Sequence, residues 1–399
     1  MTGAGDQAKP AEGAALAVVY VAVFIDLLGF GILLPSLPYY ARVLGATGFK
    51  LGVLFAAYSA AQLVGSAVLG RLSDAWGRRP ILLLSLLGSS LSMVLSGLAT
   101  SLLTLCLARG LAGLFGGSIA TAQAYIADVT PVRGRAAYMG RLGAAIGFGF
   151  VLGPALGAAV IALGYGFAGA AFTAAFLAAA NLAVASWRLP ESKGRAEAPA
   201  ARPGLAGWWR TVTRSGLSRP FGAVFAATSA FVALEATLAY LTRDRFALPE
   251  RRFGAVLVLV GFVVILVQGG LVGRLTRRFG VRHVATTGSL LMGAALALLP
   301  FSASLAVMLA LLGLAAAGQA LTSPTLSTLV SQGGTAEEHG TLLGVSQSLA
   351  AAARAVSPLA AGALYDRHPA APYVCGGLLA LVASLLVAGP GERWSRDSG

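Results

Sequence analysis

The chain alternates long apolar runs with short polar breaks. Each run is about 20 residues long, which suits a hydrocarbon core of roughly 30 Å at about 1.5 Å of helix rise per residue. The pattern predicts twelve membrane-spanning helices, and therefore an all-α membrane protein. Their approximate ranges are 15–40, 49–70, 80–99, 102–127, 137–162, 169–187, 219–241, 253–273, 282–300, 304–329, 341–364 and 372–389.

The longest polar break covers residues 188–218 and is rich in Ala, Pro, Gly and basic residues. With Trp208 and Trp209 it predicts a cytoplasmic linker that carries an amphipathic segment on the membrane surface. The linker separates an N-terminal six-helix bundle, residues 1–187, from a C-terminal six-helix bundle, residues 219–399.

The two halves repeat one another. The stretch GRLSDAWGRRP begins at Gly70 after the second predicted span, and GRLTRRFGVRH begins at Gly273 after the eighth. GPALG from Gly153 is answered at almost the same offset by SPLAAG from Ser357. Parallel repeats of this kind place a binding site near the bilayer midplane between the halves, where rocking of one half against the other gives alternating access.

Composition supports the membrane assignment, since 57% of the residues are hydrophobic and only 11% are charged. The net charge of +14 does not indicate nucleic-acid binding, because most Lys and Arg residues fall in the segments that are cytoplasmic if both termini are cytoplasmic. We expect no signal peptide, because Asp6, Lys9 and Glu12 precede an apolar run that is too long for one. Cys106, Cys375 and three histidines predict neither a disulfide framework nor a metal site.

Four stretches carry a family resemblance. GRLSDAWGRRP resembles the loop signature of the major facilitator superfamily, and GFGFVLGPALGA resembles the proline-glycine motif on the fifth helix of its antiporters. With FIDLLGFGILLPSLP and YIADVTP, the chain resembles the twelve-span drug:proton antiporter branch, which includes tetracycline exporters. The resemblance implies efflux driven by a proton gradient, without a cofactor. We expect a monomer in the cell inner membrane, with small-molecule substrates, protons and the lipid bilayer as its partners.

The loop signature joins glycines, which permit tight turns and close helix approach, to opposite charges on a short connection. Its residues here are Gly70, Asp74, Gly77, Arg78 and Arg79. The resemblance implies that the acid faces the N-terminal end of the eleventh helix and that the arginines reach an acid after the fourth helix. By position that acid is Asp128, and the contact would lock the outward-facing state. Ordinary positive-inside charges are the alternative interpretation.

The second copy of the loop signature departs from the first. Arg277 stands where the repeat would place an acid, so a mirrored lock would need Glu337 or Glu338 as its partner.

The proline-glycine motif predicts close helix packing. Gly149, Gly153 and Gly157 recur every four residues and so share one helical face. Pro154 removes one backbone hydrogen bond and can bend the helix, and Ala158 replaces the final glycine of the family pattern. A role in packing alone, without a role in antiport, is the alternative.

Four charged residues lie inside predicted spans, where each costs roughly 2.5–3.5 kcal/mol on insertion scales. They are Asp26, Arg109, Glu235 and Arg354. Helix rise puts Asp26 about 16 Å and Arg109 about 20 Å from the inner side, so the two could meet. The same arithmetic puts Glu235 about 24 Å and Arg354 about 20 Å from the cytoplasmic side, so these two could also meet.

Asp26 is the first candidate proton carrier, with Arg109 adjusting its proton affinity. The alternative is a permanent ion pair that tethers helices one and four. Glu235 is the second candidate carrier, and Arg354 either pairs with it or meets an anionic substrate. Neutral polar and aromatic residues in spans are possible cavity lining: Tyr58, Gln62, Gln123, Tyr125, Phe231, Gln319 and Gln347.

Two transport functions follow. The first is proton-coupled export of a small amphipathic or drug-like molecule by alternating access. The second is export of organic anions, sugars or lipids, with Arg354 as the anion-binding group. A membrane sensor has no appended soluble domain to support it, and an enzyme is disfavoured because no nucleophile, base and orienting group form a recognisable arrangement.

Overall fold

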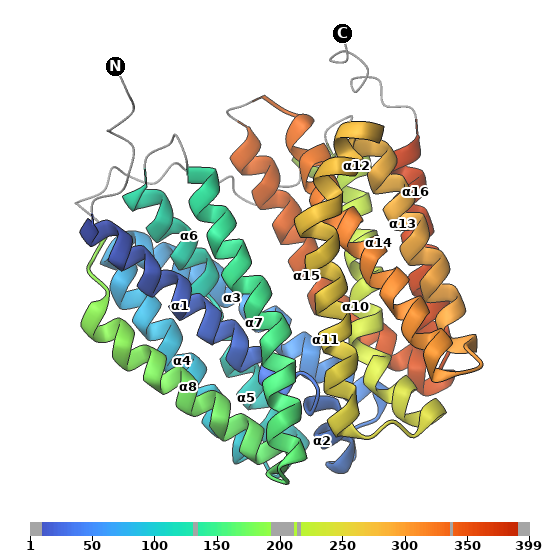
Figure 1. Cartoon of the computed structure of the whole chain (residues 1–399), viewed down its shortest axis with the longest axis horizontal. Coiled ribbons are helices and arrows are strands. Elements are labelled where there is room, and N and C mark those ends of the chain that lie inside the picture. The colour runs from blue at the N-terminus through green and yellow to red at the C-terminus, as the bar shows by residue number, and fades with distance from the viewer. Residues whose placement is uncertain (1–9, 131–134, 193–210, 214–216, 336–337, 390–399) are drawn as a thin grey trace. The chain divides into compact units, whose positions relative to one another are not determined.

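The computed structural model describes residues 10–130, 135–192, 211–213, 217–335 and 338–389. Within those residues every regular element is helical, as Figure 1 shows, so the predicted all-α fold is confirmed. The predicted amphipathic segment around Trp208 and Trp209 lies outside the described residues.

Long helices stand where the apolar pattern predicts them. Eleven helical stretches of the described chain are long and apolar enough to cross a membrane. The remaining predicted span, 341–364, forms helix α15 (His339–Arg367), whose 29 residues would extend about 43 Å. The other helices are α1 (Pro10–Leu33), α2 (Leu37–Val43), α3 (Gly48–Trp76), α4 (Arg78–Gly97), α5 (Leu102–Leu114), α6 (Ser118–Val129), α7 (Arg135–Ala162), α8 (Gly166–Arg188), α10 (Ser218–Phe246), α11 (Glu250–Leu266), α12 (Val272–Phe279), α13 (Val281–Leu298), α14 (Leu305–Gln332) and α16 (Ala371–Ala388).

Three of the predicted spans are interrupted within their length, and the ninth ends in a 3₁₀ turn, Leu299–Phe301. The first ends as α1 at Leu33 and resumes as α2, with Pro38 in the first turn, where its missing N–H is no loss. The fourth divides into α5 and α6 at the glycine-rich stretch LFGG. The eighth carries a π-helical turn, Val267–Leu271, between α11 and α12. A membrane span tolerates such breaks where protein or a wet cavity surrounds the backbone.

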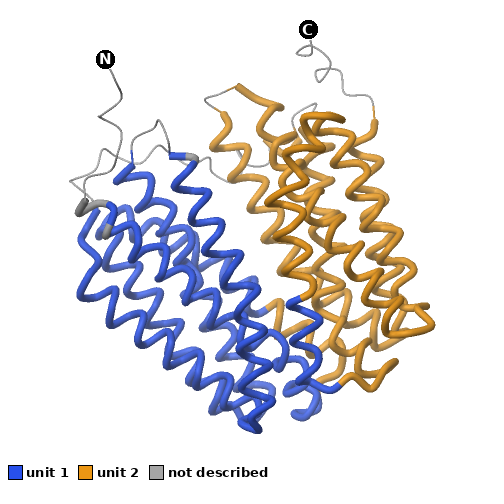
Figure 2. Tube along the Cα trace, viewed as in Figure 1, with its two compact units in different colours: residues 1–45, 57–199, 249–258 blue, residues 46–56, 200–248, 259–399 orange. Residues whose placement is uncertain are grey.

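The described chain forms two compact units, coloured separately in Figure 2. Unit 1 comprises residues 1–45, 57–199 and 249–258, and unit 2 comprises residues 46–56, 200–248 and 259–399. In unit 1, α1 packs against α7 and α8, and α4 packs against α8. In unit 2, α13 packs against α14 and α16, and α10 packs against α15 and α16.

The glycines of α7 form its contact with α1. A β-carbon on Gly153 would lie 2.7 Å from the Cα of Gly31, and one on Gly149 would lie 2.7 Å from the Cβ of Leu27. A β-carbon on Gly157 would overlap the carbonyl oxygen of Ile32. The predicted close approach of a neighbouring helix is therefore confirmed, and that helix is α1, which carries Asp26.

Candidate functional site

A pocket in unit 1 gathers several of the predicted polar residues between α1, α3, α4, α5 and α6. Its polar and aromatic lining consists of Asp26, Phe30, Tyr58, Gln62, Ser89, Arg109 and Ser118. An acid and a base of the candidate proton pathway thus share one pocket in the membrane-spanning part of the chain.

Two serine hydroxyls hold the Asp26 carboxylate. Ser89 donates to Oδ1 at 2.8 Å, and Ser118 donates to Oδ2 at 2.5 Å. An ionised carboxylate only accepts hydrogen bonds, so two donors match its charged form. A hydroxyl also accepts, so the same serines could receive the proton of the neutral acid after rotation.

The break in the fourth span places Ser118 beside this carboxylate. α5 ends at Leu114, and Ser118 is the first residue of α6. The free N–H groups at a helix start carry partial positive charge, which favours a nearby anion. The break therefore brings both a hydroxyl and the positive end of a helix to Asp26.

Arg109 lies in the same pocket but does not bind Asp26. Its side chain is 2% exposed, and its guanidinium lies 5.9 Å from the ring centre of Phe30 and 5.4 Å from that of Tyr58. Among the residues that the structure describes, no ion pair within 4.0 Å joins it to Asp26. The expected meeting of the two groups is corrected to this extent: they share a pocket without forming a permanent ion pair.

The other predicted lining residues divide into two groups. Gln62 donates to the Tyr58 hydroxyl at 3.1 Å, and both line the pocket. Tyr125 does not, because its side chain is 1% exposed and its hydroxyl donates to the carbonyl of Pro190 at 3.0 Å, so the structure contradicts its predicted place in a cavity. The remaining predicted residues stay predictions: Gln123 and Gln347 are exposed, and Phe231 and Gln319 are partly buried.

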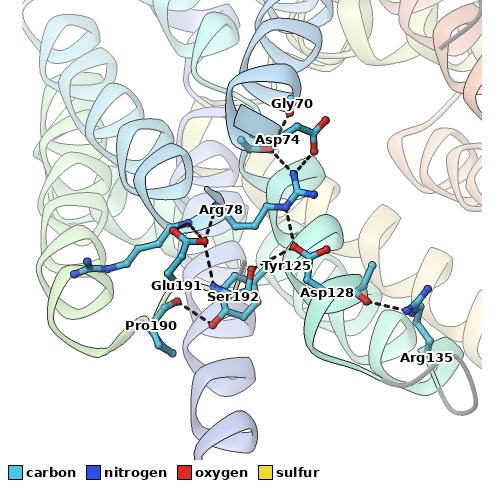
Figure 3. A network of polar contacts seen from close by, with 12 residues as sticks. Gly70, Asp74, Arg78, Tyr125, Asp128, Arg135, Pro190, Glu191 and Ser192 are labelled. Atoms are coloured by element: carbon cyan, nitrogen blue, oxygen red, sulfur yellow. Dashed lines mark hydrogen bonds and ion pairs between the residues drawn. The ribbon is translucent and has the colours of Figure 1, made fainter. Parts of the chain in front are cut away.

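The loop signature forms a polar network at the start of α4, shown in Figure 3. The Arg78 side chain is 10% exposed and binds two carboxylates: Nε donates to Asp128 Oδ2 at 2.9 Å, and Nη1 donates to Asp74 Oδ1 at 2.6 Å. Nη1 also donates to the Ser73 hydroxyl at 2.8 Å. One arginine thus ties the end of α3 and the end of α6 to the beginning of α4.

Arg79 takes a different partner from the predicted one. Its Nη2 donates to the carbonyl of Ser186 at 2.7 Å, near the end of α8, rather than to Asp128. Only Arg78 makes the expected contact, because consecutive residues of a helix point about 100° apart.

Glu191, just beyond α8, holds the N-terminus of α4. Its carboxylate accepts backbone N–H bonds from Arg78 at 2.8 Å and from Arg79 at 3.2 Å. Gly77 precedes the helix with φ of 105°, and a β-carbon there would lie 2.5 Å from Glu191 Oε2. Glycine is required at this position for its backbone angle and for the space that the carboxylate occupies.

Comparison with known proteins agrees with this geometry. The sequence model of the Major Facilitator Superfamily matches residues 19–358 and again residues 246–396. The chain belongs to the major facilitator superfamily. It is therefore a multi-pass membrane transporter and not an enzyme.

Relatives within the superfamily are drug-resistance proteins and a transporter of known structure. The chain is 30% identical to tetracycline resistance protein class B of Escherichia coli, over 88% of each chain. It is 26% identical to multidrug resistance protein 2 of Bacillus subtilis, over 90% of this chain and 91% of the relative. The crystal structure of the human organic anion transporter MFSD10 matches with a TM-score of 0.72 at 26% identity, covering 95% of this chain and all of that one.

The two charged residues of the second half, Glu235 and Arg354, lie on helices that pack together. Glu235 is exposed on α10, although its neighbours Leu234 and Ala236 are 2% and 4% exposed. Arg354 lies on α15, which packs against α10. That the two charges meet stays a prediction.

The second loop signature has no described lock of the first kind. The Glu338 carboxylate accepts from the backbone N–H of Thr335 at 3.1 Å, in the turn that precedes α15. Arg277 is exposed on α12, and Glu337 lies outside the described residues.

In the described residues no group of three His, Cys, Asp or Glu side chains could hold a metal ion.

Sequence reasoning missed Ser89, Ser118 and Glu191. Serine is common in membrane helices and its spacing gives no signal of a carboxylate partner, although Ser118 follows the two glycines that break the fourth span. Glu191 gives a weak signal, as the first acid after the sixth span.

Proposed function

We propose that this protein exports a small amphipathic, drug-like molecule in exchange for protons, by alternating access between its two halves. The observation that carries the proposal is the Asp26 carboxylate, held by two hydroxyls in a pocket that also contains an unpaired buried arginine. The similarity to tetracycline and multidrug resistance proteins supports efflux as the direction.

Competition at one carboxylate gives the coupling. Asp26 can hold a proton or stabilise a positively charged group of a substrate, but not both at once. A proton that enters from outside displaces the substrate, and a substrate that enters from the cytoplasm displaces the proton. The serine hydroxyls suit both states, because they donate to the carboxylate and can accept from the acid. Glu235, exposed on α10, is the second candidate carrier.

The loop network would hold unit 1 together during the cycle. Arg78 joins α3, α4 and α6 through carboxylates on two different helices. The close packing of α7 on α1 would transmit movement of one helix to the other, because the Gly31 and Gly153 backbones are in contact. The charge pattern supports both termini in the cytoplasm. The family resemblance supports the rest of the proposal: the inner membrane, a monomer, and no cofactor beyond the proton gradient.

An organic-anion exporter that uses Arg354 is the second candidate. The similarity to the organic anion transporter MFSD10 favours it. The predicted meeting of Arg354 with Glu235, on helices that pack together, would disfavour it, because that arginine would then already have an acidic neighbour.

Transport in proteoliposomes tests the proposal. A panel of amphipathic compounds is assayed with an imposed pH gradient, comparing the wild type with Asp26→Asn and with Asp244→Asn, an exposed carboxylate near the end of α10. We expect gradient-driven transport in the wild type and in Asp244→Asn, and loss of proton coupling in Asp26→Asn. Undiminished proton coupling in Asp26→Asn contradicts the assignment.

A further inference from the structure

Arg109 has hydrogen-bond donors that no group of the described protein accepts. Its Nε and Nη2 atoms are buried and have no hydrogen-bond partner. Among the described arginines it is the only one with two such atoms, since Arg79 and Arg135 each have one buried atom without a partner, Nε. A buried cation without a hydrogen-bond acceptor is costly, and a ligand that supplied an acceptor would offset that cost.

The two unpaired atoms form one edge of the guanidinium. Nε–H and Nη2–H point in parallel from that edge, which is the geometry that binds both oxygens of a carboxylate at once. The opposite charge is not supplied from within the pocket, because Asp26 is bound to Ser89 and Ser118 instead. The pocket thus presents one acid and one base that do not satisfy each other.

Aromatic rings lie beside the unpaired arginine. Phe30 and Tyr58 both line the pocket, and their ring centres are 5.1 Å apart. Both rings lie to the same side of the Arg109 guanidinium, with their centres 5.9 Å and 5.4 Å from its central carbon. An aromatic ring of a ligand could pack against Phe30 or Tyr58, because aromatic rings attract one another at such distances.

We propose that Arg109 binds the anionic group of an aromatic zwitterion, whose cationic group binds Asp26. The inference rests on the proposed function and names the substrate class of the same pocket. The edge of Arg109 is closed to water in this structure, so the guanidinium must turn toward the pocket when the anion enters. The cationic group still competes with the proton at Asp26, so the zwitterion is compatible with proton exchange.

Equilibrium binding to the purified protein, without a membrane or a gradient, tests the proposal. The probes are 4-(aminomethyl)benzoate and 4-(2-aminoethyl)benzoate, each compared with its amide, which keeps the cation and the ring but lacks the negative charge. Binding is read from the ligand-dependent rise in unfolding temperature. We expect the acid of at least one pair to bind at least tenfold more tightly than its amide, and Arg109→Gln to abolish that preference.

Three comparison variants complete the design. Arg109→Lys keeps the positive charge but loses the two parallel N–H donors of the guanidinium. We expect it to retain part of the preference for the acid over its amide. Arg141→Gln is the matched control, because Arg141 also lies over a tyrosine ring, at 5.2 Å from Tyr138, but is exposed. We expect it to bind as the wild type does. Asp26→Asn should weaken the acid and the amide together, because it removes the site of their shared cation.

The inference is overturned if neither acid is preferred over its amide, or if Arg109→Gln and Arg109→Lys both keep the full preference. These results do not depend on proton coupling. A protein that prefers the acids but shows no gradient-driven transport refutes the proposed exchange alone, and one that couples protons without this preference refutes the zwitterion site alone.

Discussion

Arg78 provides a quantitative test of the loop network. Replacing it with Met keeps the apolar stem but leaves Asp74 and Asp128 without their cation. Breaking a fully buried pair costs about 3–5 kcal/mol, and an exposed pair contributes about 0–1 kcal/mol. The Arg78 side chain is 10% exposed and the two acids are 23% and 27% exposed, so this pair lies between those limits. We expect Arg78→Met to lower the free energy of unfolding by about 2–3 kcal/mol.

A double-mutant cycle isolates the contact with Asp128. Unfolding is followed by equilibrium titration with a denaturing detergent for Arg78→Met, Asp128→Asn and the double variant. The charge-assisted bond from Nε at 2.9 Å should appear as a coupling energy of about 1–1.5 kcal/mol. Arg79→Met is the matched control, because its side chain binds the Ser186 carbonyl, and its effect should add to that of Asp128→Asn within about 0.5 kcal/mol.

Two results would refute this reasoning. Additive effects of Arg78→Met and Asp128→Asn would mean that the observed ion pair contributes no stability. Equal coupling of Arg78 and Arg79 to Asp128 would mean that a general positive charge, rather than a specific bond, holds the end of α6.

Two further predictions concern helix contacts. Gly153→Ala should lower the free energy of unfolding by about 1–3 kcal/mol, because the added β-carbon would lie 2.7 Å from the Gly31 Cα. Gly147→Ala on the same helix, with open space around its site, should not destabilise, and equal losses in the two variants would contradict the packing argument. Glu191→Gln should cost about 0.5–2 kcal/mol at the start of α4 and should speed amide hydrogen exchange in its first turn, since the carboxylate accepts two N–H bonds there. Unchanged exchange in that turn would show that the carboxylate charge is not needed.

The depth of a residue along its helix could be predicted from the sequence. The direction in which its side chain points around the helix axis could not. Depth arithmetic placed Asp26 and Arg109 at similar heights, and the structure puts both in one pocket. Rotation decides which side chain each one meets, and a step of one residue turns a side chain by about 100°. Asp26 therefore meets serines from α4 and α6, while Arg109 meets two rings. For the same reason Arg78 reaches Asp128 and Arg79 does not.

The sequence by itself determined the helices, their approximate ends and which charged residues lie inside the membrane spans. It could do so because a backbone in hydrocarbon must satisfy its own hydrogen bonds, which makes each span a local property of about 20 residues. Only the tertiary structure decided which groups meet. Ser118 donates to Asp26, Glu191 accepts from the first N–H groups of α4, and one edge of Arg109 has no partner. These depend on how helices far apart in the sequence are turned and packed, and no periodicity within one helix records that.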